Sequence, residues 1–203
     1  ALSESLSFLE PMAESRPSVL VVDDEPSVAQ TYSLWLEGEY DVRTANDGAE
    51  ALEAVDDATD VVLLDRRMPN VSGDEALSRM REAGYDCRVA MVTAVDPDFE
   101  IVGMPFDSYL SKPVTRDDVV DTIEELLDLA AYDEAVRERF AVERKRAALE
   151  SRKPESELAD SGEYTELQRT ADELSESTGM ELDHDSFKKA LGGIDEDDPE
   201  TAF

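Results

Sequence analysis

Carboxylates, a hydroxyl and an ammonium group stand at the ends of four short apolar runs in this chain. Asp23 and Asp24 follow the first run, Asp65 follows the second, Thr93 follows the third, and Lys112 lies just beyond the fourth. If these runs are parallel strands of one sheet, their carboxyl ends meet at one edge. Carboxylate oxygens are ligands that Mg²⁺ prefers, and a carboxylate can attack phosphorus to form an aspartyl phosphate. The sequence therefore predicts a site for a hard cation and for phosphoryl transfer.

Asp65 is the best-placed nucleophile of this set, because it follows a strongly apolar, central strand. A transferring phosphoryl group carries negative charge on its peripheral oxygens, and Mg²⁺, the Lys112 ammonium and the Thr93 hydroxyl are each able to meet one of them. Phosphorylation would then give Thr93 and Lys112 new partners and move the loops that carry them. Each residue alone reads as a cap, turn residue or surface charge, so the prediction rests on the whole set.

The elements that must position these residues are five apolar runs alternating with helical patterns. The expected strands are 18–22, 40–45, 61–64, 89–92 and 109–110. The expected helices open near Pro26, Gly48, the Ser72-x-x-Glu75 capping box, Asp96-Pro97 and Thr115. Such alternation predicts an α/β fold, a doubly wound five-stranded parallel sheet with helices on both faces.

The part of the chain beyond Ile123 has a helical pattern. Beyond Ile123 the apolar stripe continues, and neither glycine nor proline occurs before Pro154, so the helix is expected to run on past residue 130. Apolar residues then recur at three- and four-residue steps, as in a coiled-coil seam. They are Tyr164, Leu167, Ala171 and Leu174. The sequence therefore predicts a C-terminal α-helical hairpin or coiled-coil extension, with a homodimer through this region as one expectation.

The net charge of −32, from 51 acidic and 19 basic residues, is spread over the whole chain. This spread favours a general acidic bias, as in proteins of a high-salt cytoplasm, over a dedicated basic partner. The single cysteine, Cys87, excludes an internal disulfide and suits a reducing compartment. No apolar run is long enough to span a bilayer, and the start shows no secretory signal. A cytoplasmic protein without a membrane partner is expected.

Four stretches of this sequence resemble a response-regulator receiver domain, over about residues 18 to 130. They are VLVVDDE (19–25), LLDRRMPNVSG (63–73), VTA (92–94) and YLSKPV (109–114). The resemblance implies a flavodoxin-like receiver fold and a two-component response regulator whose phosphoryl group comes from a sensor histidine kinase. In this fold the regulator accepts the group and relays the change, without being an enzyme that turns over a substrate.

The resemblance also implies a role for each site residue. Asp65 matches the phospho-accepting aspartate, and Asp24 matches the direct Mg²⁺ ligand. Asp23 matches the acid that holds the waters of the metal, and the backbone carbonyl of Arg67 matches the third protein ligand. A carbonyl ligand does not depend on the type of its side chain, so an arginine at position 67 is compatible with the metal.

Three further positions match the residues that respond to phosphorylation. Thr93 matches the switch hydroxyl, Lys112 the phosphate-binding lysine, and Tyr109 the aromatic residue that turns inward on activation. Pro113 matches a proline that follows a cis peptide bond. The segment 102–106, Val-Gly-Met-Pro-Phe, departs from the usual Gly-Ala-rich approach to the last strand, so an atypical switch surface is expected.

The helical stretch 132–153 resembles the HalX domain of haloarchaeal response regulators, in agreement with the acidic composition. No winged-helix or helix-turn-helix pattern follows the receiver-like part. The expected organisation is a flexible N-terminal tail at 1–17, a receiver domain at 18–130, a helical HalX-like domain at 131–190 and an acidic disordered tail at 191–203. Transcriptional regulation is a possible output of such a chain.

Two alternatives to a phosphorylated receiver remain. One is a degenerate receiver that serves as a protein-interaction scaffold. The other is a Mg²⁺-dependent aspartyl phosphatase of the haloacid-dehalogenase type, whose chemistry needs an acid two residues after the nucleophile. Arg66 and Arg67 follow Asp65 here, which disfavours this enzyme.

The output of the helical region also has two interpretations. Residues 137–153 hold a local excess of basic residues in a strongly acidic chain, and such residues make phosphate contacts with DNA. The basic residues are Arg137, Arg139, Arg144, Lys145, Arg146, Arg152 and Lys153, and the acidic ones are Glu138, Glu143 and Glu150. No base-reading motif is visible, so a coiled-coil interaction module is preferred and DNA binding is the alternative.

Overall fold

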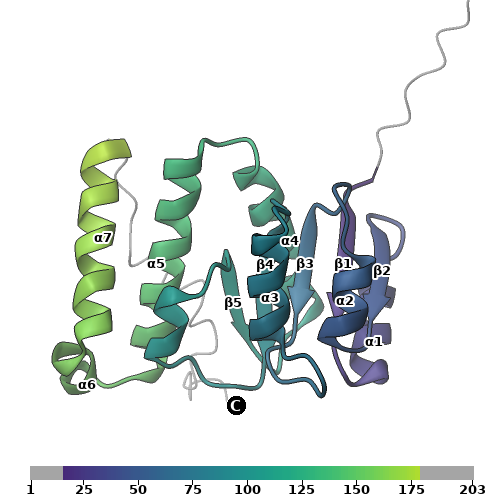
Figure 1. The fold of residues 1–203 in the computed structure, drawn as a ribbon, viewed down its shortest axis with the longest axis horizontal. Helices are drawn as coiled ribbons and strands as arrows, with labels where there is room; N and C mark the ends of the chain where they lie inside the picture. The colour runs from purple at the N-terminus through teal and green to yellow at the C-terminus, as the bar shows by residue number, and fades with distance from the viewer. Residues whose placement is uncertain (1–15, 179–203) are drawn as a thin grey trace, which may run out of the picture.

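The structure is a computed structural model that describes residues 16–178 (Figure 1). Most of the expected tail at 1–17, the end of the expected helical domain at 131–190 and the expected tail at 191–203 lie outside the described residues. No helix in the described range is long and apolar enough to cross a membrane.

Five parallel strands form one sheet in the order β2-β1-β3-β4-β5, which confirms the predicted doubly wound fold. The strands are β1 (Ser18–Val22), β2 (Asp41–Ala45), β3 (Val61–Leu64), β4 (Arg88–Thr93) and β5 (Ser108–Ser111). In the register, Val22 lies beside Leu64, Leu64 beside Met91, and Thr93 beside Ser111. The residues that follow these strands therefore emerge at one edge of the sheet.

Helices cover both faces of this sheet (Figure 1). They are α1 (Pro26–Leu36), α2 (Gly48–Ala54), α3 (Gly73–Glu82) and α4 (Arg116–Leu129). Val19 and Val21 of β1 pack in the cluster with α1 and α4, whereas Leu20 and Val22 pack in the cluster with α2 and α3. Because both faces are covered, the central strands are almost continuously apolar instead of alternating.

Local capping chemistry explains several helix starts. The Ser72 side chain accepts a hydrogen bond from Glu75 N and opens α3, and Thr115 and Asp118 form a capping box that opens α4. Between β4 and β5 the prediction was wrong in detail. The expected helix at Asp96-Pro97 is instead the 3₁₀ helix η1 (Phe99–Gly103), whose N-cap is Asp98. A 3₁₀ helix of five residues covers less of β5 than a longer α-helix would.

The helical region is three separate helices and not a continuation of α4. They are α5 (Glu134–Arg152), α6 (Glu155–Asp160) and α7 (Gly162–Thr178). The predicted run past residue 130 is wrong, because α4 ends at Leu129 and Asp133 caps a new helix by accepting from Val136 N. The break shows that an apolar stripe does not fix a helix end when a capping aspartate is available.

Helices α5 and α7 lie side by side and run in opposite directions (Figure 1). The start of α5 meets the end of α7, where Arg139 Nη1 donates to Thr178 Oγ1 at 2.9 Å. The predicted seam residues Tyr164, Leu167 and Ala171 are buried in the same core cluster as α5. The expected hairpin is therefore formed within one chain, and this part of the seam is used inside the protein.

Candidate functional site

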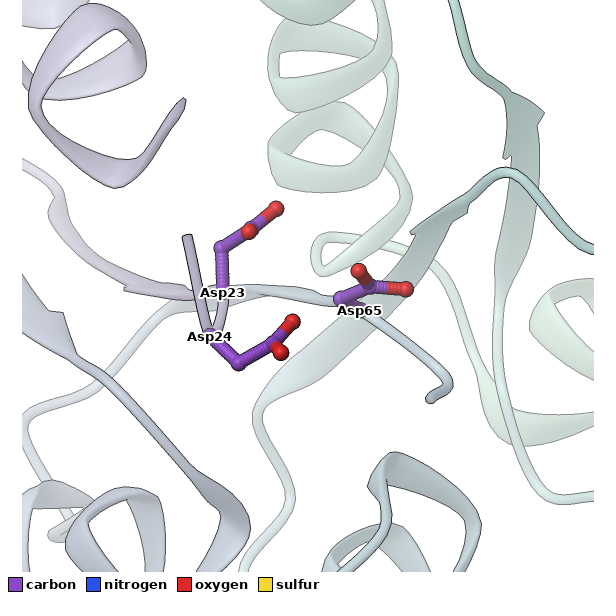
Figure 2. Close-up of side chains that lie close together, drawn as sticks. All are labelled: Asp23, Asp24 and Asp65. Carbon is purple, nitrogen blue, oxygen red and sulfur yellow. The ribbon is translucent and has the colours of Figure 1, made fainter. Parts of the chain in front are cut away.

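Three carboxylates converge at the carboxyl edge of the sheet (Figure 2). Asp23 and Asp24 follow β1, Asp65 follows the neighbouring strand β3, and each offers an oxygen within 4.8 Å of the others. Asp23 and Asp65 are 2% and 9% exposed, whereas Asp24 is exposed to solvent. Like charges this close repel one another, so the group favours a cation, and its oxygen donors suit Mg²⁺.

Lys112 reaches this group from β5, across the intervening strand β4. Its Nζ donates to Asp23 Oδ2 at 2.6 Å and to Asp65 Oδ2 at 2.9 Å. The Lys112–Pro113 peptide bond is cis, as the resemblance implies. One ammonium group faces three carboxylates, so the ionised site keeps a net negative charge that a divalent cation is able to balance.

Burial and hydrogen bonding have opposite effects on the pKa values of Asp23 and Lys112. Burial raises the pKa of Asp23, and the hydrogen bonds from Lys112 and from the Glu25 backbone N–H lower it by less. For Lys112, burial alone would lower the pKa, but the hydrogen bonds to Asp23 and Asp65 outweigh it, and the pKa lies above its ordinary value. Lys112 therefore remains an ammonium group at neutral pH.

The loop after β3 approaches Asp65 closely. The Arg67 backbone N–H donates to Asp65 Oδ1 at 3.4 Å, and Gly73 N donates to the carbonyl of Arg66 at 2.9 Å. A Cβ on Gly73 would lie 2.1 Å from the carbonyl oxygen of Asp65, so only glycine fits at the start of α3. The Arg67 side chain is exposed beside this loop. Its backbone carbonyl as a metal ligand stays a prediction.

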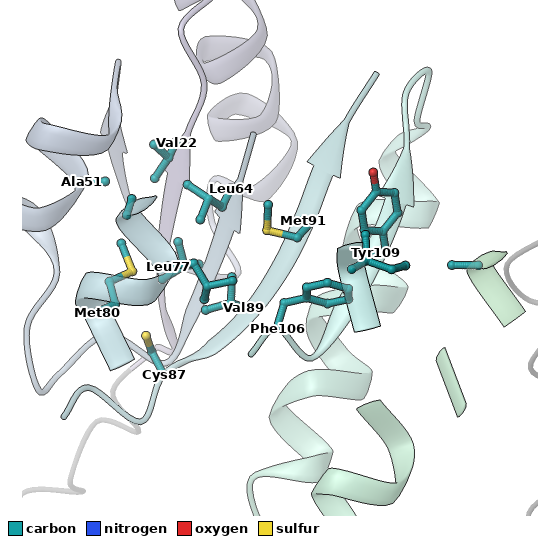
Figure 3. Packing of buried hydrophobic residues seen from close by; sticks show 14 of the residues in the cluster. Val22, Ala51, Leu64, Leu77, Met80, Cys87, Val89, Met91, Phe106 and Tyr109 are labelled. Carbon is teal, nitrogen blue, oxygen red and sulfur yellow. The ribbon is translucent and has the colours of Figure 1, made fainter. Parts of the chain in front are cut away.

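Thr93 and Tyr109 meet at the backbone of Val95 in the loop after β4. The Thr93 Oγ1 accepts from Val95 N at 3.3 Å, and the Tyr109 hydroxyl donates to Val95 O at 2.5 Å. Thr93 is fully buried, and Tyr109 is 2% exposed and packs beside Phe106 in the core (Figure 3). Both predicted switch residues are thus linked to one short loop, at one side of the carboxylates.

Arg66 is a site neighbour whose role sequence reasoning missed. It is 4% exposed, and its guanidinium bonds Asp74 of α3 at 3.0 Å and Glu100 of η1 at 2.6 Å. Burial opposes its charge, but the hydrogen bonds to the two carboxylates hold its pKa above the ordinary value. An arginine two residues after a buried strand was the available signal. The pairing ties the phospho-acceptor loop to two other elements.

The basic stretch 137–153 contacts its own chain. Arg144 and Lys145 are 3% and 8% exposed, which is far too buried for an open phosphate-binding surface. The pairs are Arg137 with Asp86, Arg139 with Thr178, Arg144 with Glu125, Lys145 with the carbonyl of Met104, Arg146 with Glu143, Arg152 with Asp96 and Lys153 with Asp98. DNA binding through this stretch stays a prediction, and in this arrangement these side chains are engaged elsewhere.

Comparison with known proteins gives two family matches. The response regulator receiver domain family matches residues 19–124, and the HalX domain family matches residues 128–198. A putative transcriptional regulator of Haloferax volcanii is 58% identical over 135 residues, which is 66% of this chain and 23% of that protein. The sensor histidine kinase RcsC of Salmonella typhi is 37% identical over 148 residues, which is 70% of this chain and 15% of that protein. The matched parts therefore span less than a quarter of these two relatives.

Solved structures show the same fold for the sheet region. The receiver domain of the Francisella response regulator 1452 is 29% identical, with a TM-score of 0.52, covering 57% of this chain and 99% of that structure. A CheY-like receiver domain protein from Methanospirillum hungatei is 27% identical, with a TM-score of 0.51, covering 56% of this chain and 95% of that structure.

Proposed function

This chain belongs to the response regulator receiver family, and we propose that it is a two-component response regulator phosphorylated on Asp65 by a sensor histidine kinase with Mg²⁺. The observation that carries the proposal is the convergence of three carboxylates and the Lys112 ammonium at the carboxyl edge of the sheet. The relay of the change to the HalX region, at about residues 131–190 after a receiver at 18–130, is part of the same proposal.

The donor set fits a divalent cation. Asp24 would bind the metal directly, Asp23 would hold its waters, and Asp65 and the Arg67 carbonyl would complete the protein ligands. When bound, Mg²⁺ would supply positive charge to the oxygens of the transferring group. Asp23 and Asp65 already share Lys112, so the cation would join a site whose buried carboxylates are partly neutralised.

The transfer itself needs one nucleophile and a poised leaving group. A carboxylate oxygen of Asp65 attacks phosphorus, an O–P bond forms, and the P–N bond to the kinase's phosphohistidine breaks. The electron pair stays on the imidazole nitrogen, which takes a proton from solvent. Lys112 orients Asp65 through Oδ2 before the transfer and then faces a phosphoryl oxygen. The Thr93 hydroxyl, at the end of the next strand, is the second group able to bind that phosphoryl group.

The output of this switch is the helical region. A relative of this chain in Haloferax volcanii is called a putative transcriptional regulator, and this supports transcriptional control as the end result. Among the described residues, the basic stretch contacts the receiver and α7, so we favour protein contacts of α5–α7 over direct phosphate contacts with DNA. A homodimer through the helical region would require a surface other than the buried seam.

The test is phosphorylation by acetyl phosphate with Mg²⁺ in concentrated KCl, read by intact mass. We expect the native chain to gain one phosphoryl group, Asp65→Ala to gain none, and Asp57→Ala to gain one. Asp57 is a matched control because it is an exposed aspartate in the loop after α2, away from the carboxyl edge. A folded native chain without a mass gain would instead support the degenerate receiver that acts as a scaffold. Sustained turnover of a phosphomonoester would support the phosphatase.

A further inference from the structure

The last turn of α5 is ion-paired with the loop that directly follows Thr93. Lys153 Nζ lies 3.0 Å from Asp98 Oδ1 and 4.7 Å from the centre of the Phe99 ring, and Arg152 Nε lies 3.6 Å from Asp96 Oδ1. These two ion pairs, Arg152–Asp96 and Lys153–Asp98, are called the latch below. The latch joins the helical region to a loop that starts at a residue of the proposed phosphorylation site.

A second contact lies further along the same segment of the receiver. Lys145 Nζ donates to the carbonyls of Val102 and Met104 at the end of η1, at 3.2 and 2.6 Å, and lies 5.0 Å from the centre of the Phe106 ring. Arg144 Nη1 donates to the carbonyl of Asp107 at 3.2 Å. These contacts of Arg144 and Lys145 are called the anchor below, because both side chains are buried.

The apolar surroundings make α5 part of the receiver core. Leu149 is fully buried and Ala148 nearly so, in the same cluster as Phe106 and Tyr109. Only the short η1 stands between β4 and β5, so α5 supplies apolar cover that a longer helix there would give. The helical region is therefore packed on the segment that connects Thr93 to Tyr109.

The two ends of this contact differ in strength. The anchor cations are 3% and 8% exposed, and breaking such contacts leaves buried polar groups unpaired. The latch carboxylates of Asp96 and Asp98 are 78% and 61% exposed, and ion pairs of that kind contribute little. A small displacement of the loop is therefore able to open the latch while the anchor stays closed.

Phosphorylation is expected to displace the loop that follows Thr93. The Thr93 hydroxyl accepts from Val95 N, and Val95 O accepts from the Tyr109 hydroxyl, so both switch residues fix the first residues of the loop. If Thr93 turns towards a phosphoryl group on Asp65, its contact with Val95 lengthens. The latch carboxylates lie one and three residues further along the chain.

We propose that phosphorylation of Asp65 opens the latch and lets the C-terminal end of α5 pivot about the anchor. The position of this end of α5 then depends directly on whether the receiver is phosphorylated. This inference rests on the proposed function, since it needs a phosphoryl group at Asp65. It assigns the basic residues at the end of α5 to an internal docking contact, with the receiver segment 96–107 as the partner.

The experiment is hydrogen–deuterium exchange of backbone amides 149–160 in the full chain, with and without acetyl phosphate and Mg²⁺. Intact mass of the same samples reports phosphorylation. Lys153→Glu is the variant that breaks the Lys153–Asp98 pair of the latch and puts a like charge against Asp98, and Lys153→Arg is its matched control because it keeps the charge. Arg169→Glu is a surface control, since Arg169 pairs with Glu166 and Glu173 on the outer face of α7.

Without phosphodonor we expect several-fold faster exchange in Lys153→Glu than in the native chain, and no change in the two controls. Phosphorylation should raise exchange in the native chain to about the level of Lys153→Glu, and should add little in that variant. A phosphorylated native chain with unchanged exchange in 149–160 overturns the inference and leaves the proposed function intact. A native chain that gains no phosphoryl group overturns both the proposed function and the switching step. Equal exchange in Lys153→Glu and the native chain overturns the latch whatever the phosphorylation result.

Discussion

Two lysines, half-buried Lys112 and buried Lys145, mark two regions that are built in opposite ways. At the carboxyl edge, Lys112 bonds the carboxylates of Asp23 and Asp65, and its pKa lies above the ordinary value. At the contact between α5 and η1, Lys145 bonds the carbonyls of Val102 and Met104, and burial lowers its pKa to about 8. The same ammonium group is stabilised by full charges in one place and by dipoles in the other.

The partners of these two ammonium groups indicate what each region is able to do. The carboxyl edge holds more negative than positive charge, so it remains incomplete until a cation or a phosphoryl group changes the balance. The α5 contact has its cations satisfied by carbonyls and by acids of the same chain, so nothing further is required there. The first region is suited to respond, and the second to hold the responding segment in place.

The largest effect is expected from Lys112→Met. This change leaves two buried carboxylates without their counter-charge, and removal of one partner of such a pair costs about 3–5 kcal/mol of unfolding free energy. Because a divalent cation would replace the missing charge, MgCl₂ should restore part of the loss. Urea unfolding in concentrated KCl, with and without MgCl₂, measures both quantities. A loss that MgCl₂ does not reduce would contradict the view of the carboxyl edge as a cation site.

A smaller effect is expected from Lys145→Met, which keeps an unbranched apolar side chain in place of the lysine stem. The two carbonyls lose their donor, which costs about 1–3 kcal/mol, while the cost of burying a charge disappears. The same urea series should show no dependence on MgCl₂ for this loss. Equal recovery of both lysine variants by MgCl₂ would remove the distinction between the two regions.

The smallest effect is a pH dependence that belongs to Lys145. Its folded pKa of about 8 lies below the ordinary value of 10.5, so between these values the unfolded chain binds the proton that the folded chain has lost. Stability should therefore rise with pH in this window, by up to about 2 kcal/mol from pH 8 to pH 9.5. Asp107 and Glu138 face this ammonium and limit the effect.

The measurement is the difference in unfolding free energy between the native chain and Lys145→Met, taken at pH 7.5, 8.5 and 9.5. The difference removes contributions from groups that titrate in both proteins. A native chain whose advantage over the variant shrinks with rising pH would show that Lys145 is stabilised as an ammonium group, as Lys112 is.

Much of the fold was predictable because its signals are local. Apolar runs of strand length, the Ser72 and Thr115 caps and the alternation of elements are properties of short stretches. The positions of Asp23, Asp24 and Asp65 follow from them, because parallel strands place their carboxyl ends at one edge. The roles of these residues in phosphorylation and metal binding stay predictions, which the mass measurement and the MgCl₂ series test respectively.

The amino-acid sequence alone was enough to predict the doubly wound sheet and the side chains that meet at its carboxyl edge, because alternating strands and helices imply parallel strands whose carboxyl ends share one edge. Only the tertiary structure decided what the charges elsewhere are paired with. Arg66 reads as a plain cation in sequence and is buried between α3 and η1, and Lys145 reads as part of a basic surface and lies against η1. The physical reason is that helical periodicity shows which face of a helix is buried, but it does not show which element packs against that face. A buried charge then pairs with whichever distant group the packing brings near.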